Sequence, residues 1–538
     1  MRTRHVRVSR GPAKLGVALV SLSFSTFWFA DAANAAGVVE AARDGDLATV
    51  RELIGAGADA NAIAKDGSTP LLWAAYHSDV EMAKALLAAG ADPNVANDFG
   101  VTPLLQASRY GDAAMIKVLL EGGADREASS REGETPLMAA SRAGSVEAVK
   151  LLLEAGADPN ATESLQDQTA LMWATAEGHL DVVDALLAAG ADPNMKARVS
   201  ELEKRSTRTD FPTGGFTAVM WAARNGNEAL VRRLVEGGAD LNITNGDGVT
   251  AMMLAIVNDH FDLVPTLLEL GADPNDGSLY WVTEMRDATT DWRARDGSRL
   301  RVDYPNELTA LDLTRILLEA GADPNKPFVG RMTNSSMCCD TYANATPFYR
   351  SSVAADVEGM KLMIAHGANL EWTPSPAEDG PRMGPSNVGK TPLMVAMNGG
   401  KGVGMAGGPG DIREGAAPPF REPANRNPLD AVKLLLEAGA NPNAKTPEGD
   451  SVLHLAAKEG KLDIIRVLVE GGADLQIKNA EGLTPLQMAE RMPPRPPPPT
   501  SGALAGEPQG AEPEEVAALL RELMAGNVQA NAVEGRPQ

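Results

Sequence analysis

Residues 123–160 read GADREASSREGETPLMAASRAGSVEAVKLLLEAGADPN, and this stretch decides the fold. Thr135 precedes Pro136, which is typical of a helix start, because threonine caps the first turn and proline there lacks only an N–H that the helix does not use. After a glycine break, apolar residues at helical spacing predict a second helix that ends at Gly156 in a left-handed conformation. Residues 158–160 then predict a turn.

The same unit recurs along most of the chain. A Gly-Ala-Asp/Asn motif occurs eleven times, most often 33 residues apart, and a Thr-Pro-Leu-like motif keeps step with it seven times. One such unit cannot bury its own apolar face, so neighbouring units must stack into a solenoid rather than form several globular domains. The glycines are Gly57, Gly90, Gly123, Gly156, Gly190, Gly238, Gly271, Gly321, Gly367, Gly439 and Gly472, and the threonines are Thr69, Thr102, Thr135, Thr169, Thr217, Thr391 and Thr484.

This period, with T-P-L-x-x-A and L-L-x-x-G-A-D-x-N, closely resembles the ankyrin repeat over roughly residues 37–490. The resemblance implies an all-α solenoid of about 11 or 12 helix-turn-helix repeats with β-turn fingers and three insertions. The expected segments are a signal peptide (1–35), repeats 1–7 (36–275, insertion 196–215), degenerate repeats with an insertion (276–372), a Gly/Pro-rich insertion around a repeat start at 391 (373–427), the last repeats (428–490), a Pro-rich linker (491–512) and a capping helix (513–526).

The fourth position of the motif departs from the family pattern. Ankyrin repeats place there a histidine that bonds a neighbouring turn, and this chain has histidine only at His454. Leucine or methionine occupies the position at Leu72, Leu105, Met138, Met172, Met220, Met253 and Met394. A methionine stripe at repeat spacing indicates core packing, because methionine fills irregular gaps. No metal site is therefore expected from these methionines.

The first 35 residues have the order of a secretory signal peptide. Five basic residues precede an uncharged run from Leu15 to Ala30, and residues 33–35 offer an Ala-x-Ala cleavage site. A membrane-spanning helix needs roughly 20 apolar residues, so we expect cleavage near Ala35/Ala36 rather than an anchor. The sequence thus predicts a periplasmic or secreted protein without stable membrane insertion.

The charge balance excludes one class of partner. The chain carries 49 Lys+Arg against 72 Asp+Glu, a net charge of −23, and removal of the first 35 residues leaves −27. Nucleic-acid binding requires a basic footprint, so no nucleic-acid partner is expected. We expect a monomer.

Nucleotide binding and catalysis are not indicated. Residues 384–391 match the P-loop pattern letter for letter, but the preceding residues 373–383 are Pro-rich and polar rather than a buried strand, and Thr391 already starts a repeat. The mature histidines lie in separate repeats without ligand spacing, and no Ser/His/Asp set is present. The sequence predicts no catalytic residues, no metal and no cofactor.

Cys338 and Cys339 are the only cysteines, and they are adjacent. In an oxidising compartment they could form a strained and therefore labile disulfide, which would suit a redox switch. A soft metal site with nearby methionines, or two simply buried side chains, are the alternatives.

The candidate binding residues lie where ankyrin proteins usually contact their partners, on the concave face after T-P-L-x-x-A-A and at the finger tips. Tyrosine, tryptophan and arginine are enriched at binding hot spots, and basic residues here reverse the sign of an acidic chain. The three tryptophans could instead pack between repeats. The set is Tyr76, His77, Arg109, Tyr110, Arg142, Glu177, Arg224 and Asn225, with Trp73, Trp173 and Trp221 on the inner helices and Lys65, Phe99, Arg131 and Glu132 at finger tips.

These patterns favour a non-enzymatic scaffold or accessory factor that binds a protein partner outside the cytoplasm. Two alternatives stay open at this point. One is a redox- or metal-responsive envelope protein that uses Cys338 and Cys339, and the other is a secreted effector that binds a host protein. A count of free thiols in the native protein separates the first alternative from a simple scaffold.

Overall fold

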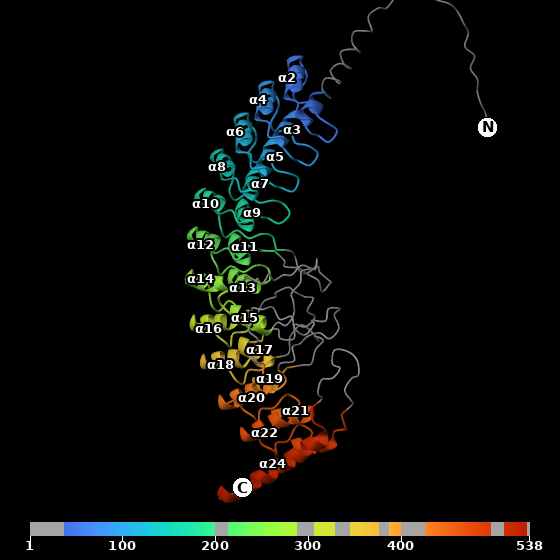
Figure 1. Cartoon of the computed structure of the whole chain (residues 1–538), viewed down its shortest axis with the longest axis vertical. Helices are drawn as coiled ribbons and strands as arrows, with labels where there is room; N and C mark the ends of the chain where they lie inside the picture. The colour runs from blue at the N-terminus through green and yellow to red at the C-terminus, as the bar shows by residue number, and fades with distance from the viewer. Residues whose placement is uncertain are drawn as a thin grey trace, which may run out of the picture. The chain divides into compact units, whose positions relative to one another are not determined.

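The computed structural model describes residues 37–199, 214–287, 306–328, 345–375, 387–399, 426–495 and 510–534. The chain divides into two compact units, residues 1–191 and 192–538, which are described separately. Within the described residues, the regular elements are helices, joined by turns and a few isolated β-bridges (Figure 1). The expectation of an all-α repeat solenoid is confirmed.

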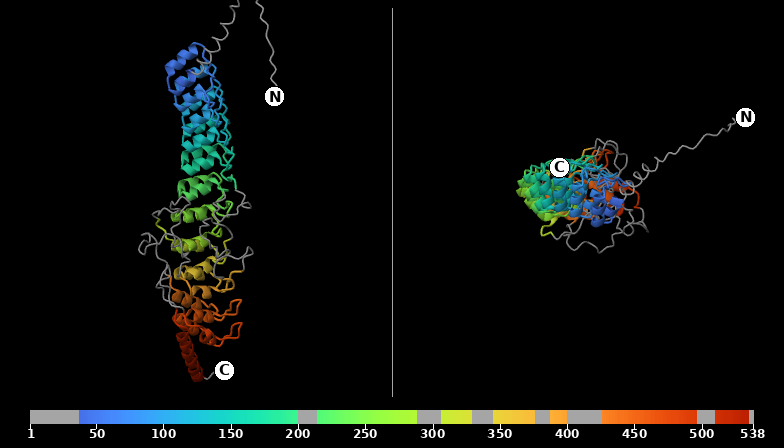
Figure 2. Two further views of the ribbon diagram at one scale, coloured as in Figure 1. Left: turned by 90° about the vertical axis from the view of Figure 1, so that its right-hand side faces the viewer. Right: turned by 90° about the horizontal axis from the view of Figure 1, so that it is seen from above.

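The first unit is a stack of helix pairs that follow one another in chain order (Figure 2). We call the first helix of each pair, next to the finger loops, the inner helix, and the second the outer helix (Figure 1). After a short helix at 37–43 and α2 (Leu47–Gly55) the pairs are α3 (Pro70–Tyr76) and α4 (Val80–Ala88), α5 (Pro103–Arg109) and α6 (Ala113–Glu121), α7 (Pro136–Ala143) and α8 (Val146–Glu154), and α9 (Ala170–Glu177) and α10 (Leu180–Ala188).

The inner helices begin as the sequence predicts. The Thr69 hydroxyl accepts a hydrogen bond from the backbone N–H of Leu72 (3.2 Å), and Thr135 does the same for Met138 (3.3 Å). Proline follows each threonine, so the first turn loses no hydrogen bond. Gly144 ends α7 in the left-handed conformation (φ 75°), as its place between the two helices requires.

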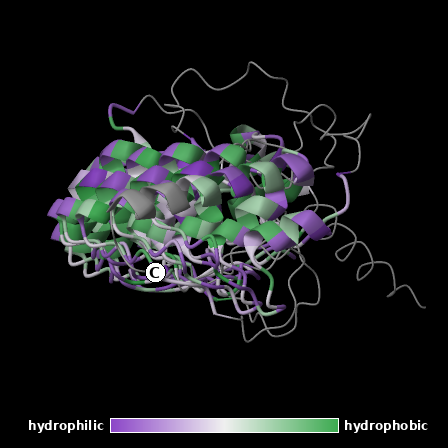
Figure 3. Cartoon of the chain, turned by 90° about the horizontal axis from the view of Figure 1, so that it is seen from below, coloured by the Kyte–Doolittle hydropathy of each residue, from purple (hydrophilic) through white to green (hydrophobic). Residues whose placement is uncertain are grey.

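The core lies between the inner and outer layers. Met138 and Met172 are buried, which confirms that the methionine stripe is packing. Helices seen from this end carry both hydrophobic and hydrophilic residues (Figure 3), as a two-layer stack with one buried face needs. Nε2 of His454, in the second unit, donates to the carbonyl of Leu483 (3.0 Å), so this histidine bonds the neighbouring turn as expected.

An asparagine ladder joins successive turns. The Asn61 amide donates to the carbonyl of Gly90 (2.9 Å) and accepts from the N–H of Asp92 (2.6 Å). Asn94 makes the same two bonds one repeat later, with Gly123 and Asp125. The second unit uses Asn194, Asn242, Asn275, Asn325 and Asn443 in the same way.

The second unit continues the pairing with irregularities. Its elements are α11 (Ala218–Arg224) and α12 (Glu228–Glu236), α13 (Ala251–Val257) with η2 (Phe261–Leu263) and α14 (Val264–Glu269), α15 (Ser278–Asp287) and α16 (Ala310–Glu319), α17 (Pro347–Ala354) and α18 (Val357–Ala365), α19 (Pro392–Ala396) and α20 (Pro428–Glu437), α21 (Val452–Glu459) and α22 (Leu462–Glu470), α23 (Pro485–Arg491) and α24 (Pro513–Glu534). Helix α24 extends past 526, where the sequence places its end.

The segment 276–307 belongs to the stretch in which degenerate repeats are expected, and its residues 276–287 and 306–307 are described. Its first part is the inner helix α15, which begins directly after a shortened turn without a Thr-Pro start. Two ion pairs hold this helix: Arg286 with Asp356 (2.5 and 2.7 Å) and Glu284 with Arg350 (2.6 and 2.9 Å). The Arg286 and Asp356 side chains are only 7% and 2% exposed.

Candidate functional site

A continuous row of side chains runs along the inner helices of the first unit. Stacking of one repeat on the next brings them together, although they lie up to a hundred residues apart in sequence. We call this set the inner row, and it consists of Trp73, Tyr76, His77, Arg109, Tyr110, Arg142 and Trp173.

The first half of the inner row is aromatic. The Tyr76 ring lies edge-on to Trp73 (5.5 Å between centroids) and to Tyr110 (6.1 Å). Tyr76 and Tyr110 stay 50% and 52% exposed, which is unusual for large rings. His77 is partly committed to structure, since its Nε2 donates to the carbonyl of Arg43 (2.7 Å).

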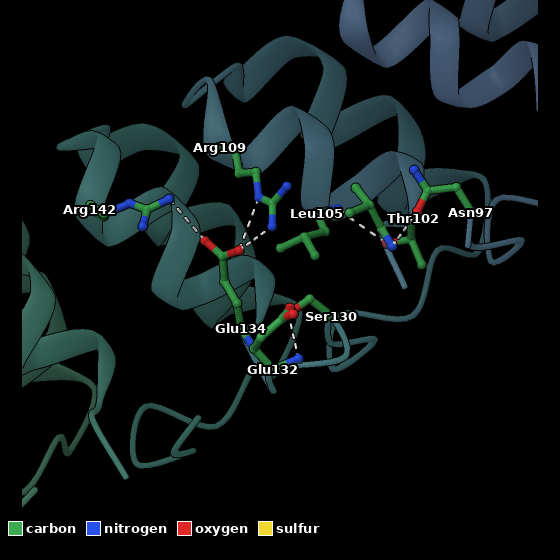
Figure 4. Close-up of polar contacts among 9 residues, drawn as sticks. Asn97, Thr102, Leu105, Arg109, Ser130, Glu132, Glu134 and Arg142 are labelled. Carbon is green, nitrogen blue, oxygen red and sulfur yellow. Dashed lines mark hydrogen bonds and ion pairs between the residues drawn. The ribbon is translucent and has the colours of Figure 1, made fainter. Parts of the chain in front are cut away.

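The second half of the inner row is a charged cluster centred on Glu134. Arg109, at the end of α5, donates from Nε to Glu134 Oε2 (3.0 Å) and also through Nη2. Arg142, from α7, donates from Nη2 to Glu134 Oε1 (3.1 Å). The two arginines reach the carboxylate from neighbouring inner helices (Figure 4). The Glu134 side chain is 10% exposed, against 32% for Arg109 and 49% for Arg142.

Both arginines, which the sequence predicts to contact a partner, therefore also bind a carboxylate of this chain. Sequence reasoning missed Glu134, which immediately precedes Thr135 and so sits at the base of a finger, 25 residues from Arg109. The sequence does mark this residue: the position before the motif threonine is acidic here, whereas the neighbouring repeats carry Val101 and Gln168 there.

The tryptophans are half-buried and partly structural. The Arg142 guanidinium lies over the Trp173 ring (4.8 Å), and Trp173 Nε1 donates to Gln168 Oε1 (2.8 Å). The Nε1 atoms of Trp73 and Trp221 are buried without an acceptor among the described residues. The three indoles are thus half-buried against neighbouring side chains, and their contact with a partner stays a prediction.

Exposed large hydrophobic residues gather on the same side of the first unit. Besides the two tyrosines, the fingers expose Ile63 (64%), Phe99 (66%) and Leu165 (64%). Across the described ranges, the outer helices carry no exposed large hydrophobic residue. Ile63 and Leu165 were not predicted, because a single apolar residue in a loop gives no periodic signal.

The predicted residues Trp221, Arg224 and Asn225 belong to the second unit. The Arg224 guanidinium lies over the Trp221 ring (5.3 Å), which also contacts Phe216 (5.1 Å). Desolvation by burial lowers the pKa of the Arg224 guanidinium, although the residue as a whole is exposed. In the described part of the chain this arginine has no carboxylate partner.

Other expectations fall on residues outside the described ranges. These are the signal peptide, Cys338 and Cys339, most of the basic insertion at 196–215 and the start of the P-loop-like stretch. In the ranges that are described, no three or more His, Cys, Asp or Glu side chains are grouped to hold a metal ion. Nor does any described helix combine the length and the apolar character that crossing a membrane requires.

Comparison with protein families identifies the class. A model of ankyrin repeats (three copies) matches residues 38–129, 106–197, 201–278 and 423–492, and a single-repeat model matches residues 388–447. The chain belongs to the ankyrin-repeat family. No curated protein matches it in a sequence search. Ankyrin repeats generally mediate protein–protein interaction, and proteins of this class are typically non-enzymatic binding scaffolds.

Proposed function

We propose that this protein is an exported, non-enzymatic scaffold or accessory factor that binds a protein partner in the periplasm or outside the cell. The partner contacts the inner row and the neighbouring fingers of the first unit. Both parts of the proposal, the location and the surface, have their own support and their own test.

The distribution of exposed apolar side chains carries the binding proposal. Large rings and aliphatic chains cost free energy when they face water, about 1.5 to 3 kcal/mol for each one left unburied. In the first unit they occur at inner-helix ends and fingers, represented by Tyr76, Tyr110 and Phe99, while the outer helices carry none. Clustered exposed apolar groups with arginine and tyrosine are typical of a protein-binding surface.

Site-specific photo-crosslinking tests the surface. A photoreactive phenylalanine analogue placed at Tyr110 should yield a covalent adduct of defined mass in the native host. The matched control places the same residue at Lys117, on the exposed side of the outer helix α6. Adducts of equal yield from both positions, or from Lys117 alone, would contradict the proposed surface.

The order of charged, apolar and small residues in the first 35 positions supports export. Fractionation of the native host, followed by mass measurement of the protein, tests this part. The expected mature N-terminus is Ala36, recovered outside the cytoplasm. A chain that keeps its initial segment and stays in the cytoplasm would overturn the export proposal and leave the binding surface untouched.

A further inference from the structure

The charged half of the inner row holds two guanidinium groups against one carboxylate. Glu134 engages Arg109 through Nε and Nη2 but Arg142 only through Nη2. Arg142 is 49% exposed, and its remaining N–H donors have no hydrogen-bond partner among the described residues. The cluster therefore carries a net positive charge and unused donors on the surface of a chain whose net charge is −23.

This positive cluster adjoins the exposed aromatic pair. Arg109 and Tyr110 are consecutive residues at the end of α5, and Tyr110 contacts Tyr76 of the preceding repeat. On the other side, the guanidinium of Arg142 lies over the Trp173 ring. An apolar patch and a guanidinium pair thus lie side by side, in an order set by the repeat stack.

Resting on the function proposed above, we propose that the partner offers an extended peptide segment in which an acidic residue lies close to a large apolar one. The apolar side chain packs on Tyr76 and Tyr110, and the carboxylate binds Arg142 and Arg109. Guanidinium–carboxylate pairs are strong and geometrically specific, which suits recognition of one acid. The acidity of the rest of the chain disfavours a partner with many acids, so a single carboxylate in an apolar context fits best.

Glu134 has a defined part in this recognition. As a carboxylate already bound to both arginines, it competes with the partner's acid for the same donors. It therefore lowers the affinity for acidic peptides. By holding the guanidinium groups in place, it also disfavours ion pairs between these arginines and other carboxylates. Removing its charge should strengthen binding of an acidic peptide, whereas a purely structural Glu134 would weaken binding when changed.

Selection from a random twelve-residue peptide library displayed on phage tests the proposal with the mature chain, residues 36–538. We expect enriched peptides to pair Asp or Glu with an aromatic or aliphatic residue. In fluorescence anisotropy, replacing the peptide's acid by its amide should weaken binding about 10-fold, because a hydrogen bond to a charged group contributes about 1.5 kcal/mol. In the variant Arg142→Gln, the same change in the peptide should alter the affinity little. The variant Glu134→Gln should bind the acidic peptide several-fold more tightly than the wild type does.

The controls separate this inference from the function on which it rests. Lys150→Gln, on the outer helix α8, removes one positive charge elsewhere and should leave affinity unchanged. Circular dichroism melts verify that each variant is folded. Two results would overturn the acidic specificity: selected peptides that lack acids, or an equal loss of affinity on replacing the acid by its amide in Arg142→Gln. If Tyr110→Ala still abolished binding in that case, the proposed surface would stand. Binding that survives Tyr76→Ala with Tyr110→Ala would refute the surface itself, and failure to select any peptide would refute an extended-segment partner.

Discussion

At residue 127 the asparagine ladder of the first unit is interrupted. Glu127 accepts a hydrogen bond from the N–H of Asp158 (2.8 Å), as asparagine does in other repeats. Its carboxylate cannot donate to the carbonyl of Gly156, and it places negative charge beside the C-terminal end of α8, where the helix dipole is also negative. This turn is therefore a weak link in an otherwise regular ladder.

Glu127→Asn should stabilise the protein by about 0.5 to 1 kcal/mol, since it adds one hydrogen bond and removes an unfavourable charge. Urea denaturation followed by circular dichroism measures the change. The reverse substitution, Asn94→Glu, is the matched control and should destabilise the preceding turn by a similar amount. If Asn94→Glu were neutral, the ladder would not contribute to stability.

Asp276 is a second residue whose environment can be tested, because it shifts the pKa of the carboxyl group and so affects the pH dependence of stability. Burial raises its pKa above the ordinary value, although the carboxylate accepts hydrogen bonds from Thr250 Oγ1 (2.5 Å) and the N–H of Ser278 (2.7 Å). Because the folded-state pKa is the higher one, the protonated form stabilises the fold at low pH. That contribution is lost as the pH rises from the unfolded-state pKa through the folded-state pKa.

Asp276→Asn should therefore flatten the pH dependence of stability in that window and raise the melting temperature at neutral pH. Thermal melts from pH 4 to pH 8 on wild type and variant provide the measurement. A variant whose melting temperature falls equally at every pH would show that the hydrogen bonds matter more than the buried charge.

At the element scale, the turn between the inner helix α7 and the outer helix α8 is sterically constrained. A Cβ atom at Gly144 would lie 2.6 Å from Cε1 of His179, the residue that caps the next outer helix. Gly123 has a similar left-handed φ (89°), but an added Cβ there meets nothing within 4 Å. Alanine at Gly123 would therefore meet backbone strain alone, whereas alanine at Gly144 would meet backbone strain and a steric clash.

Gly123→Ala should cost about 1 kcal/mol for the left-handed backbone alone, and Gly144→Ala clearly more, because the His179 ring must also move. Equilibrium unfolding of the two variants gives the comparison. Equal costs would mean that the ring shifts freely and that this junction is looser than its geometry indicates.

The α15 junction of the second unit depends on a buried ion pair. Replacing Arg286 by leucine leaves the Asp356 carboxylate, 2% exposed, without its partner, and should cost about 3 kcal/mol or more. The double variant Arg286→Leu with Asp356→Asn should recover part of this loss, because an amide is cheaper to bury. Unfolding free energies of the single and double variants form the test, and a double variant worse than the single would contradict it.

Sequence predicted these elements to different degrees. Wherever Thr-Pro-Leu and Gly-Ala-Asp occur, helix starts and ends follow from local chemistry, as Thr135 and Gly156 illustrate. Helix α15 lacks both the threonine and the proline, and its ion pair joins residues 70 apart, so periodicity could not reveal it. The inner row was partly foreseen by position, whereas Glu134 was not, since the stacking of one repeat on the next decides which arginines it meets.

At the scale of the whole molecule, stability is local. In a repeat array each repeat contacts mainly its neighbouring repeats, so a local loss of stability should decrease with distance along the chain. Hydrogen exchange followed by mass spectrometry on Arg286→Leu should show faster exchange in α15 through α18 and unchanged exchange in α5 and α7. Uniformly faster exchange along the chain would instead indicate a single cooperative unit.

The asparagine ladder also has a consequence for the gene. Asn61 meets Gly90 and Asp92 with the same atoms with which Asn94 meets Gly123 and Asp125. An unequal crossover that removes or duplicates 33 codons between equivalent positions would therefore preserve the bond at the new joint. Such a gene can lengthen or shorten its product without new chemistry, whereas a joint at Glu127 would keep only the bond that this residue accepts from Asp158.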